Sequence, residues 1–97
     1  MSVEYTGDQL GAGVCVILVA MEPGGRVRLH RHSYEEVFVV EAGESTFTVG
    51  DEERLVRAPD VVVVPAGVPH GFANNGDQLL RQVDIHVSPR FDTEWLE

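Results

Sequence analysis

Closely spaced turn residues constrain the fold of this chain more than any other feature of its 97-residue sequence. Pairs such as Pro23-Gly24, Gly50-Asp51 and Asn75-Gly76 favour turns, and the runs between them are rich in valine. Runs this short cannot form a long helix, and turns about 8–12 residues apart are typical of an all-β sandwich or barrel. We therefore expect about eight short strands, over residues 13–22, 26–32, 36–42, 45–49, 54–58, 60–64, 70–73 and 79–88.

The two ends of the chain fit this pattern less well. Residues 1–12 are polar and contain two glycines, so we expect a lead-in with little regular structure. Residues 91–97 form a C-terminal tail after Pro89, and we expect one helical turn there, packed on the barrel. The length is that of one domain, so residues 1–97 are predicted to form a single all-β domain, a sandwich or a jelly roll.

Two of the expected strands are apolar on both faces. Residues 37–40 and 61–64 contain only valine and one phenylalanine. One face of each strand must line the interior, and the other must also be covered from water. A chain of 97 residues has little left to cover it, so we predict a homodimer or larger oligomer built sheet against sheet.

Charge and cysteine content exclude several classes of function. The chain has 16 Asp and Glu against 7 Lys and Arg, a formal net charge of −9, which argues against nucleic acid and anionic membranes as partners. Cys15 is the only cysteine, so no intramolecular disulfide can form, and its apolar neighbours indicate a small core residue. No secretory signal and no membrane-spanning stretch is visible, so we expect a cytoplasmic protein.

The chemistry of the chain is concentrated in a short stretch around residue 30. His30 and His32 are two residues apart on an expected strand, so their side chains share one face. Glu36 keeps the same parity, whereas the neighbouring Glu35 does not, so we favour Glu36 as the third member. Two imidazoles and one carboxylate on one face form the open set of ligands that suits non-haem iron and related metals.

A second stretch, residues 65–70, ends in His70 and offers a fourth candidate ligand. His30, His32, Glu36 and His70 are thus the candidate ligands of a divalent transition metal. These ligand types suit iron, manganese, nickel, copper or zinc, and they do not decide among them.

The two stretches together resemble the paired motifs of the cupin family. Residues 24–43 have the spacing of its first motif: Gly24-x5-His30-x-His32-x3-Glu36-x6-Gly43. Residues 59–74 have the spacing of its second motif: x5-Pro65-x-Gly67-x2-His70-x3-Asn74. One position departs, because Pro59 stands where the second motif usually opens with glycine, and we expect a changed turn there rather than a lost fold.

The resemblance implies a small single-domain cupin with a jelly-roll (double-stranded β-helix) barrel. It implies that His30, His32, Glu36 and His70 hold the metal inside the barrel, and that the protein forms a dimer. Cupins range over dioxygenases, decarboxylases, isomerases, epimerases, binding proteins and storage proteins, so the fold does not fix the function.

Three functions remain open. The first is a metal-dependent enzyme, a dioxygenase or related lyase, acting on a small oxygenated molecule held in the barrel. The second is a binding or sensing module in which the metal only anchors a small ligand. The third is an isomerase or epimerase of sugars or other polyols, which ranks lower because no second catalytic base stands out in the sequence.

Several other residues have two interpretations. Arg28 shares the parity of His30 and could bring a cation to the pocket, but a solvated strand end is the more common case. Phe38, Phe47 and Phe72 could line a pocket or simply form the core. In the last strand, residues 82, 84 and 86 are polar and residues 83, 85 and 87 apolar. The polar set could hold a ligand imidazole in one tautomer, but we expect the apolar face inward and the polar face, His86 included, in water.

Overall fold

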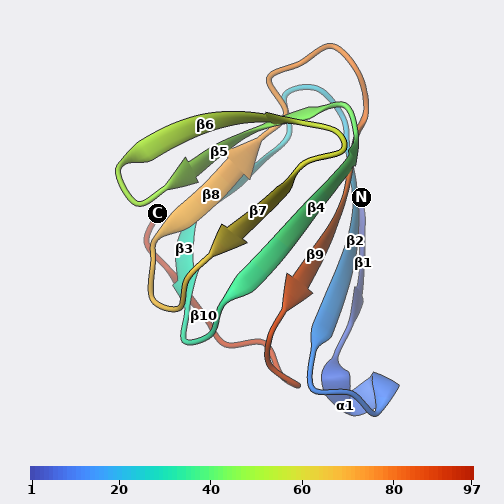
Figure 1. Ribbon diagram of the computed structural model, residues 1–97, viewed down its shortest axis with the longest axis vertical. Coiled ribbons are helices and arrows are strands. Elements are labelled where there is room, and N and C mark those ends of the chain that lie inside the picture. The colour runs from blue at the N-terminus through green and yellow to red at the C-terminus, as the bar shows by residue number, and fades with distance from the viewer.

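A computed structural model describes residues 1–97 as two five-stranded antiparallel sheets packed face to face (Figure 1). The first sheet contains, in spatial order, β1 (Ser2–Tyr5), β2 (Cys15–Met21), β9 (Leu80–His86), β4 (Glu36–Ala42) and β7 (Val61–Val64). The second contains β10 (Thr93–Trp95), β3 (Arg26–His32), β8 (His70–Ala73), β5 (Glu44–Val49) and β6 (Glu52–Arg57). The predicted all-β jelly roll is therefore confirmed.

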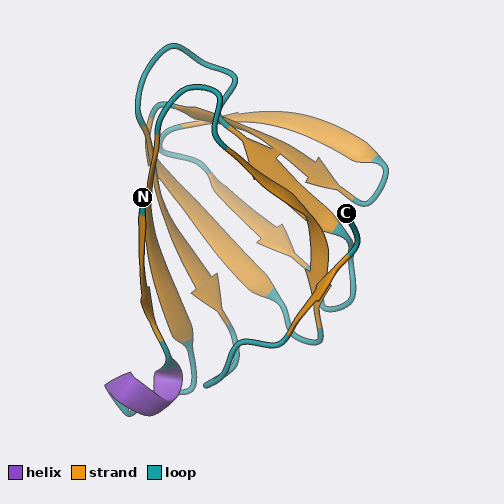
Figure 2. Cartoon of the chain, turned by 180° about the vertical axis from the view of Figure 1, so that it is seen from behind, coloured by secondary structure: helices purple, strands orange, loops and turns teal.

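The apolar core fills one half of the space between the sheets. Its centre is a group of three phenylalanines, Phe38, Phe47 and Phe72, with ring centroids 5.0–5.9 Å apart. Buried valines from the strands on either side and Leu80 complete the cluster. The other half contains a cavity, which is lined in part by residues of β1 and β10, the edge strands at one end of each sheet; Figure 2 shows the chain from behind.

Both ends of the chain carry more regular structure than we predicted. Residues 2–5 pair with β2, and a one-turn helix, α1 (Gly7–Leu10), follows them. The helix begins with a capping box, in which the Thr6 side chain accepts from the Gln9 backbone and the Gln9 side chain accepts from the Thr6 backbone. None of the helical structure has the length and hydropathy needed to cross a membrane.

The prediction of a helical turn in residues 91–97 is wrong. Thr93–Trp95 form β10, which pairs with β3, and the Leu96 backbone N–H donates to the Leu29 carbonyl. The edge of β3 offers unpaired backbone groups along its length, and pairing with them satisfies more of the tail's backbone than one helical turn would.

The alternation predicted along residues 26–32 is broken by a bulge. The pairing of β3 with β8 shifts register between Val27 and His30. Val27 therefore faces the interior together with His30, whereas Arg28 is exposed. The prediction that Arg28 and His30 share a face is wrong for this reason.

The expected orientation of the last strand is also reversed. In β9, Gln82, Asp84 and His86 are buried and point between the sheets. Val83 and Ile85 point outward. Alternation gives two faces but does not say which is inside, and here the outward apolar side belongs to a larger apolar surface.

That surface covers the outer face of the first sheet. Two rows of apolar side chains cross all five of its strands. The registers give the rows as Val63, Val37, Ile85, Val16, Tyr5 and Val61, Val39, Val83, Leu18, Val3. The second faces of the two strands that we predicted to be apolar on both sides thus lie on one continuous outer surface, which we call the outer apolar face.

The turns that the motifs predicted have the required backbone. Gly43 has φ of +80°, and a Cβ there would lie 2.6 Å from the Leu79 carbonyl oxygen. Asn74 is fully buried and its side chain donates to the carbonyls of Met21 and Gln78, both at 2.9 Å. At Pro59 the chain turns through a cis peptide bond and enters β7.

Candidate metal centre

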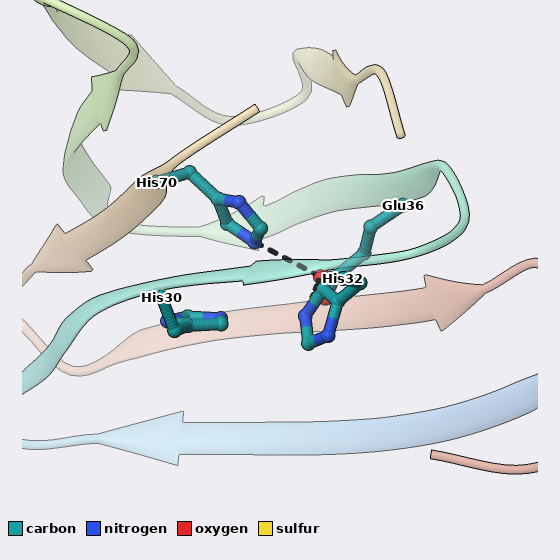
Figure 3. A group of neighbouring side chains, drawn as sticks. All are labelled: His30, His32, Glu36 and His70. Atoms are coloured by element: carbon teal, nitrogen blue, oxygen red, sulfur yellow. Dashed lines mark hydrogen bonds and ion pairs between the residues drawn. The ribbon is translucent and has the colours of Figure 1, made fainter. Parts of the chain in front are cut away.

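Four side chains from both sheets meet between the sheets (Figure 3), and three of them, His30, His32 and Glu36, also line the cavity. His30 and His32 come from β3, and His70 comes from the adjacent β8, where it is the register partner of His30. Glu36 opens β4 in the opposite sheet. All four are buried, and one potential ligand atom from each lies within 4.8 Å of the others.

The sequence identified Glu36 for an incomplete reason. We placed it by strand parity with His32, but a turn separates the two residues and they lie in different sheets. Glu36 reaches the imidazoles across the barrel interior. Glu35, the alternative carboxylate, lies in the turn and is exposed.

Backbone carbonyls fix the orientation of all three imidazoles. His30 Nδ1 lies 2.6 Å from the Arg28 carbonyl oxygen, His70 Nδ1 lies 2.9 Å from that of Val68, and His32 Nδ1 lies 3.0 Å from that of Asp92. A carbonyl oxygen can only accept, so each Nδ1 carries the proton and donates. In a neutral ring the Nε2 atom then keeps its lone pair, which is the form that binds a metal.

The Glu36 carboxylate faces two of these Nε2 lone pairs. Its Oε1 atom lies 3.0 Å from His32 Nε2 and 3.2 Å from His70 Nε2. His32 Nε2 is buried and has no partner with hydrogen-bond geometry. An acceptor oxygen facing acceptor nitrogens at these distances is repulsive unless a cation, either protons or a metal ion, is shared among them. The donor set therefore fits a divalent metal.

Burial and the contacts among the four side chains shift their pKa values in opposite directions. Burial lowers the pKa of His30 to about 4, so that imidazole is neutral near pH 7. Burial alone would also lower the pKa of His32, but the Glu36 carboxylate and the Asp92 carbonyl outweigh it, and the pKa is raised. Burial would raise the pKa of Glu36, but its contacts with His32, His70 and His86 keep that pKa well below its usual range.

His86, for which we predicted a solvated position, holds the other side of Glu36. Its Nε2 atom lies 3.0 Å from Glu36 Oε2, and its Nδ1 atom lies 2.7 Å from the Tyr34 hydroxyl. Because the hydroxyl can donate to Nδ1, His86 Nε2 can carry a proton and donate it to Oε2. His86, held by Tyr34, thus occupies Glu36 Oε2 and leaves Oε1 facing the other imidazoles.

The C-terminal segment supplies further contacts around the centre. Besides the Asp92 carbonyl, the Thr93 hydroxyl lies 3.2 Å from His32 Nδ1. The Trp95 and His30 rings have centroids 4.9 Å apart, and the Phe91 ring meets His86 edge-on at 5.0 Å. No sequence motif marked these residues, because the contacts depend on β10 pairing with β3.

The cavity beside the centre has a volume of about 420 Å³. Its walls are mostly apolar and include Ile17, Phe38 and Phe72. Two of the three phenylalanines with two interpretations thus serve both core and cavity, whereas Phe47 belongs to the core alone. Cys15 is fully buried in the sheet and does not line the cavity, as expected for a small core residue.

Arg28 does not bring a cation into the cavity. Its guanidinium lies over the Trp95 ring, 4.8 Å from the centroid, and donates to the Glu97 carbonyl at 2.9 Å. Arg26 pairs with the Glu97 carboxylate at 2.8 Å. Both arginines therefore fasten the end of the chain on the outside of the barrel.

A protein-family model described as "Cupin domain" matches residues 17–86 of the chain. The H2HPP isomerase of Bacillus subtilis is 35% identical over 71 residues, which are 72% of this chain and 30% of that protein. The polyketide synthase CurC of Streptomyces cyaneus is 37% identical over 73 residues, which are 74% of this chain and 47% of that protein. The chain thus spans less than half the length of these two relatives.

Among solved structures, the Bacillus subtilis oxalate decarboxylase, a protein with Mn(II) centres, superposes with a TM-score of 0.87. The superposition covers 98% of this chain and 27% of that one, at 24% sequence identity. A likeness at this level of identity establishes a shared fold.

Proposed function

The chain is a member of the cupin family, and from that premise we propose that it binds a divalent transition metal and acts on a small oxygenated molecule beside it. The proposed ligands are His30, His32, Glu36 and His70. The proposed activity is that of a metal-dependent enzyme, a dioxygenase or related lyase.

One observation carries this proposal. Three imidazoles have their Nδ1 protons committed to backbone carbonyls, and two of them place Nε2 within 3.2 Å of the buried Glu36 carboxylate. One potential ligand atom from each of the four side chains lies within 4.8 Å of the others. Such a cluster is expensive to bury without a cation, and a divalent metal satisfies all four groups at once.

The residues of the chain would divide the work as follows. The neutral imidazoles supply lone pairs, and Glu36 supplies one negative charge against the cation. His86 and Tyr34 hold the carboxylate, and the apolar cavity wall excludes water from the bound molecule. A metal bound here would polarise ligand oxygens and, if redox-active, would also engage dioxygen.

A second candidate function is an isomerase that needs no oxygen. The observation in its favour is the relative named H2HPP isomerase, which is 35% identical over 72% of this chain. His86 lies beside the cavity and Tyr34 behind it, so two groups able to hold or move a proton are present, which the sequence did not reveal.

We also propose that two copies associate through the outer apolar face. Val61, Val63 and Leu18 on this face are 56%, 50% and 45% exposed in a single chain. The two rows contain no charged side chain, although the net charge of the chain is −9. An apolar surface that crosses a whole sheet fits a second copy of itself in a twofold dimer.

Elemental analysis of tag-free protein, beside a His70→Ala variant, tests the metal. We expect close to one transition metal per chain in the wild type and a loss of at least tenfold in the variant. A matched Asn74→Ala variant keeps all four ligands and controls for general destabilisation. Equal metal content in wild type and His70→Ala, with both folded, would contradict the proposal.

The reaction class is tested with the metal-loaded protein and a panel of enols, diketones and phenols. Turnover that consumes dioxygen supports the dioxygenase. Equal turnover in air and under argon supports a lyase or the isomerase, and analysis of the products then distinguishes these two. A ligand-induced rise in Tm without any product would instead favour the binding module and contradict an enzymatic role.

A further inference from the structure

The cavity carries no positive side chain. Neither lysine nor arginine lines it, while two buried carboxyl groups, Glu36 and Asp84, do. Arg26 and Arg28 on β3 are bound to the end of the chain at Glu97, and the Arg28 guanidinium lies over the Trp95 ring. A ligand carboxylate that entered would lose its hydration and meet no cationic side chain in return, so that only the proposed metal would offset its charge.

Asp84 is the polar group in this cavity that the metal centre does not use. It is 4% exposed and lies on β9 between Ile17 and Phe38, its register partners on the neighbouring strands. Its one hydrogen bond is from Gln82 Nε2 to Oδ1, at 2.9 Å. The other carboxyl oxygen has no partner in the protein.

The surroundings favour the neutral form of this carboxyl group. Burial raises the pKa of Asp84 well above its usual range, and the negative charge of Glu36 raises it further, against a smaller opposite effect of Gln82. Since Oδ1 accepts from Gln82, the proton belongs on Oδ2. Asp84 then offers a hydrogen-bond donor to the cavity.

We propose that the cavity binds uncharged, mainly apolar molecules, and that Asp84 Oδ2 donates a hydrogen bond to an oxygen of the ligand. This inference rests on the proposed function, because it names the class of molecule that would reach the metal. Ile17, Phe38, Phe72 and Phe91 supply the apolar contacts, and they suit a ring.

A carboxylate ligand is disfavoured by the same geometry. It would bring a second negative charge beside Glu36, and no cationic side chain of the cavity would offset that charge. A site built around a donor also penalises a ligand that lacks the matching acceptor, because the buried donor is then left unpaired. The selectivity thus has an attractive and a repulsive part.

Salicylamide and salicylate test this inference, since they have nearly the same shape and differ in charge. Titration calorimetry with the zinc-loaded protein avoids redox turnover. We expect salicylamide to bind at least fivefold more tightly than salicylate. Tighter binding of salicylate, or binding of neither probe, would overturn the inference.

Substitutions of Asp84 separate donation from simple repulsion. Asp84→Asn keeps an acceptor for Gln82 and a donor for the cavity, so salicylamide affinity should stay within about twofold of wild type. Asp84→Leu removes the donor, and salicylamide affinity should fall at least fivefold. Wild-type affinity in Asp84→Leu, or a tenfold gain of salicylate in Asp84→Asn, would contradict a neutral donor at Asp84.

Controls keep the two proposals apart. Glu4→Gln removes an exposed acid at the rim of the cavity and should leave the preference unchanged. Zinc content is measured for every protein before titration. Equal zinc content in the wild type and His70→Ala would contradict the proposed function. A wild type that is fully loaded with zinc but prefers salicylate would contradict only the present inference. The wild-type comparison stands even if Asp84→Leu does not fold.

Discussion

At the residue scale, two of the three imidazoles are oriented by the backbone just before them in the sequence. His30 and His70 each use the carbonyl two residues earlier, Arg28 and Val68, so the local backbone fixes the tautomer. His32 depends on Asp92, which is 60 residues away in the sequence. The motif spacing therefore predicts which residues meet, but it does not predict what holds each ring.

The position of His86 leads to a prediction about metal affinity. In His86→Leu the Glu36 Oε2 atom loses its partner, and the carboxylate can turn or bind the metal through both oxygens. We expect metal affinity, measured by competition with a chelating dye, to fall about 10–100-fold. The visible spectrum of the Co(II)-loaded protein should change as well, since it reports the coordination of the carboxylate.

Two variants control this prediction. His86→Gln restores a donor and should recover part of the affinity and the wild-type Co(II) spectrum. Tyr34→Phe removes only the hydroxyl that contacts His86 Nδ1 and should lower metal affinity less than His86→Leu does. If His86→Leu binds metal within twofold of wild type with an unchanged spectrum, His86 does not position Glu36.

Asp84 leads to a prediction about stability. A carboxyl group whose pKa is higher in the folded than in the unfolded chain binds more protons when folded, so stability falls as the pH rises above its unfolded pKa, near 3.8. In metal-free protein at pH 7.5, Asp84→Asn should therefore raise the free energy of unfolding by about 1 kcal/mol, or Tm by about 4–8 °C.

The pH dependence of that gain is the decisive measurement. Thermal melts of wild type and Asp84→Asn should differ most near pH 7.5, and the difference should shrink as the pH falls toward 3.8. Asp77→Asn, in an exposed loop, is the matched control and should show no such trend. A constant difference at every pH would mean that Asp84 acts through packing rather than charge.

At the element scale, local signals in the sequence predicted strands well and their orientation poorly. The bounds of β3, β4 and β8 agree with the predicted residues 26–32, 36–42 and 70–73. The part of β3 before His30 and the whole of β9 did not follow the predicted orientation, because a bulge shifts the first and the strands beside β9 extend its apolar side into the outer apolar face. Both effects are set by neighbouring strands, which no local pattern contains.

The C-terminal element leads to a prediction about the centre. Deleting residues 92–97 removes the carbonyl that orients His32, the Thr93 contact and the ring over His30. We expect the domain to remain folded, because the core cluster contains none of these residues, and metal affinity to fall about 10–100-fold in dye competition.

A shorter deletion serves as its control. Removing residues 96–97 alone takes away the contacts of Glu97 with Arg26 and Arg28 but leaves Asp92 and Thr93 in place. Metal affinity should then stay within about threefold of wild type. Equal losses in the two deletions would show that the tail acts by general stabilisation and not through His32.

At the scale of the whole molecule, the two faces of the first sheet differ in polarity. The inner face carries the buried polar side chains Glu36, Asp84 and His86, while the outer face carries only apolar side chains in its two rows. The sequence showed that two strands were apolar on both sides. It could not show that three further strands extend the same outer surface, because that depends on the strand order.

The outer apolar face leads to a prediction about assembly. Leu18→Lys places a charge within this face, and Leu55→Lys places the same charge on β6 in the other sheet; the two leucines are 45% and 52% exposed. Both side chains are solvent-exposed in a single chain, so neither substitution should unfold the protein. Burying an unpaired lysine at the interface should weaken dimerisation at least 100-fold in Leu18→Lys and leave it unchanged in Leu55→Lys.

Sedimentation velocity over a range of protein and salt concentrations measures this. The wild type should sediment as a dimer, and more salt should strengthen the association, because it screens the repulsion between two chains that each carry a net charge of −9. A wild-type monomer would contradict the interface outright. A dimer that survives Leu18→Lys but is broken by Leu55→Lys would move the interface to the second sheet, and the outer apolar face would then need another partner.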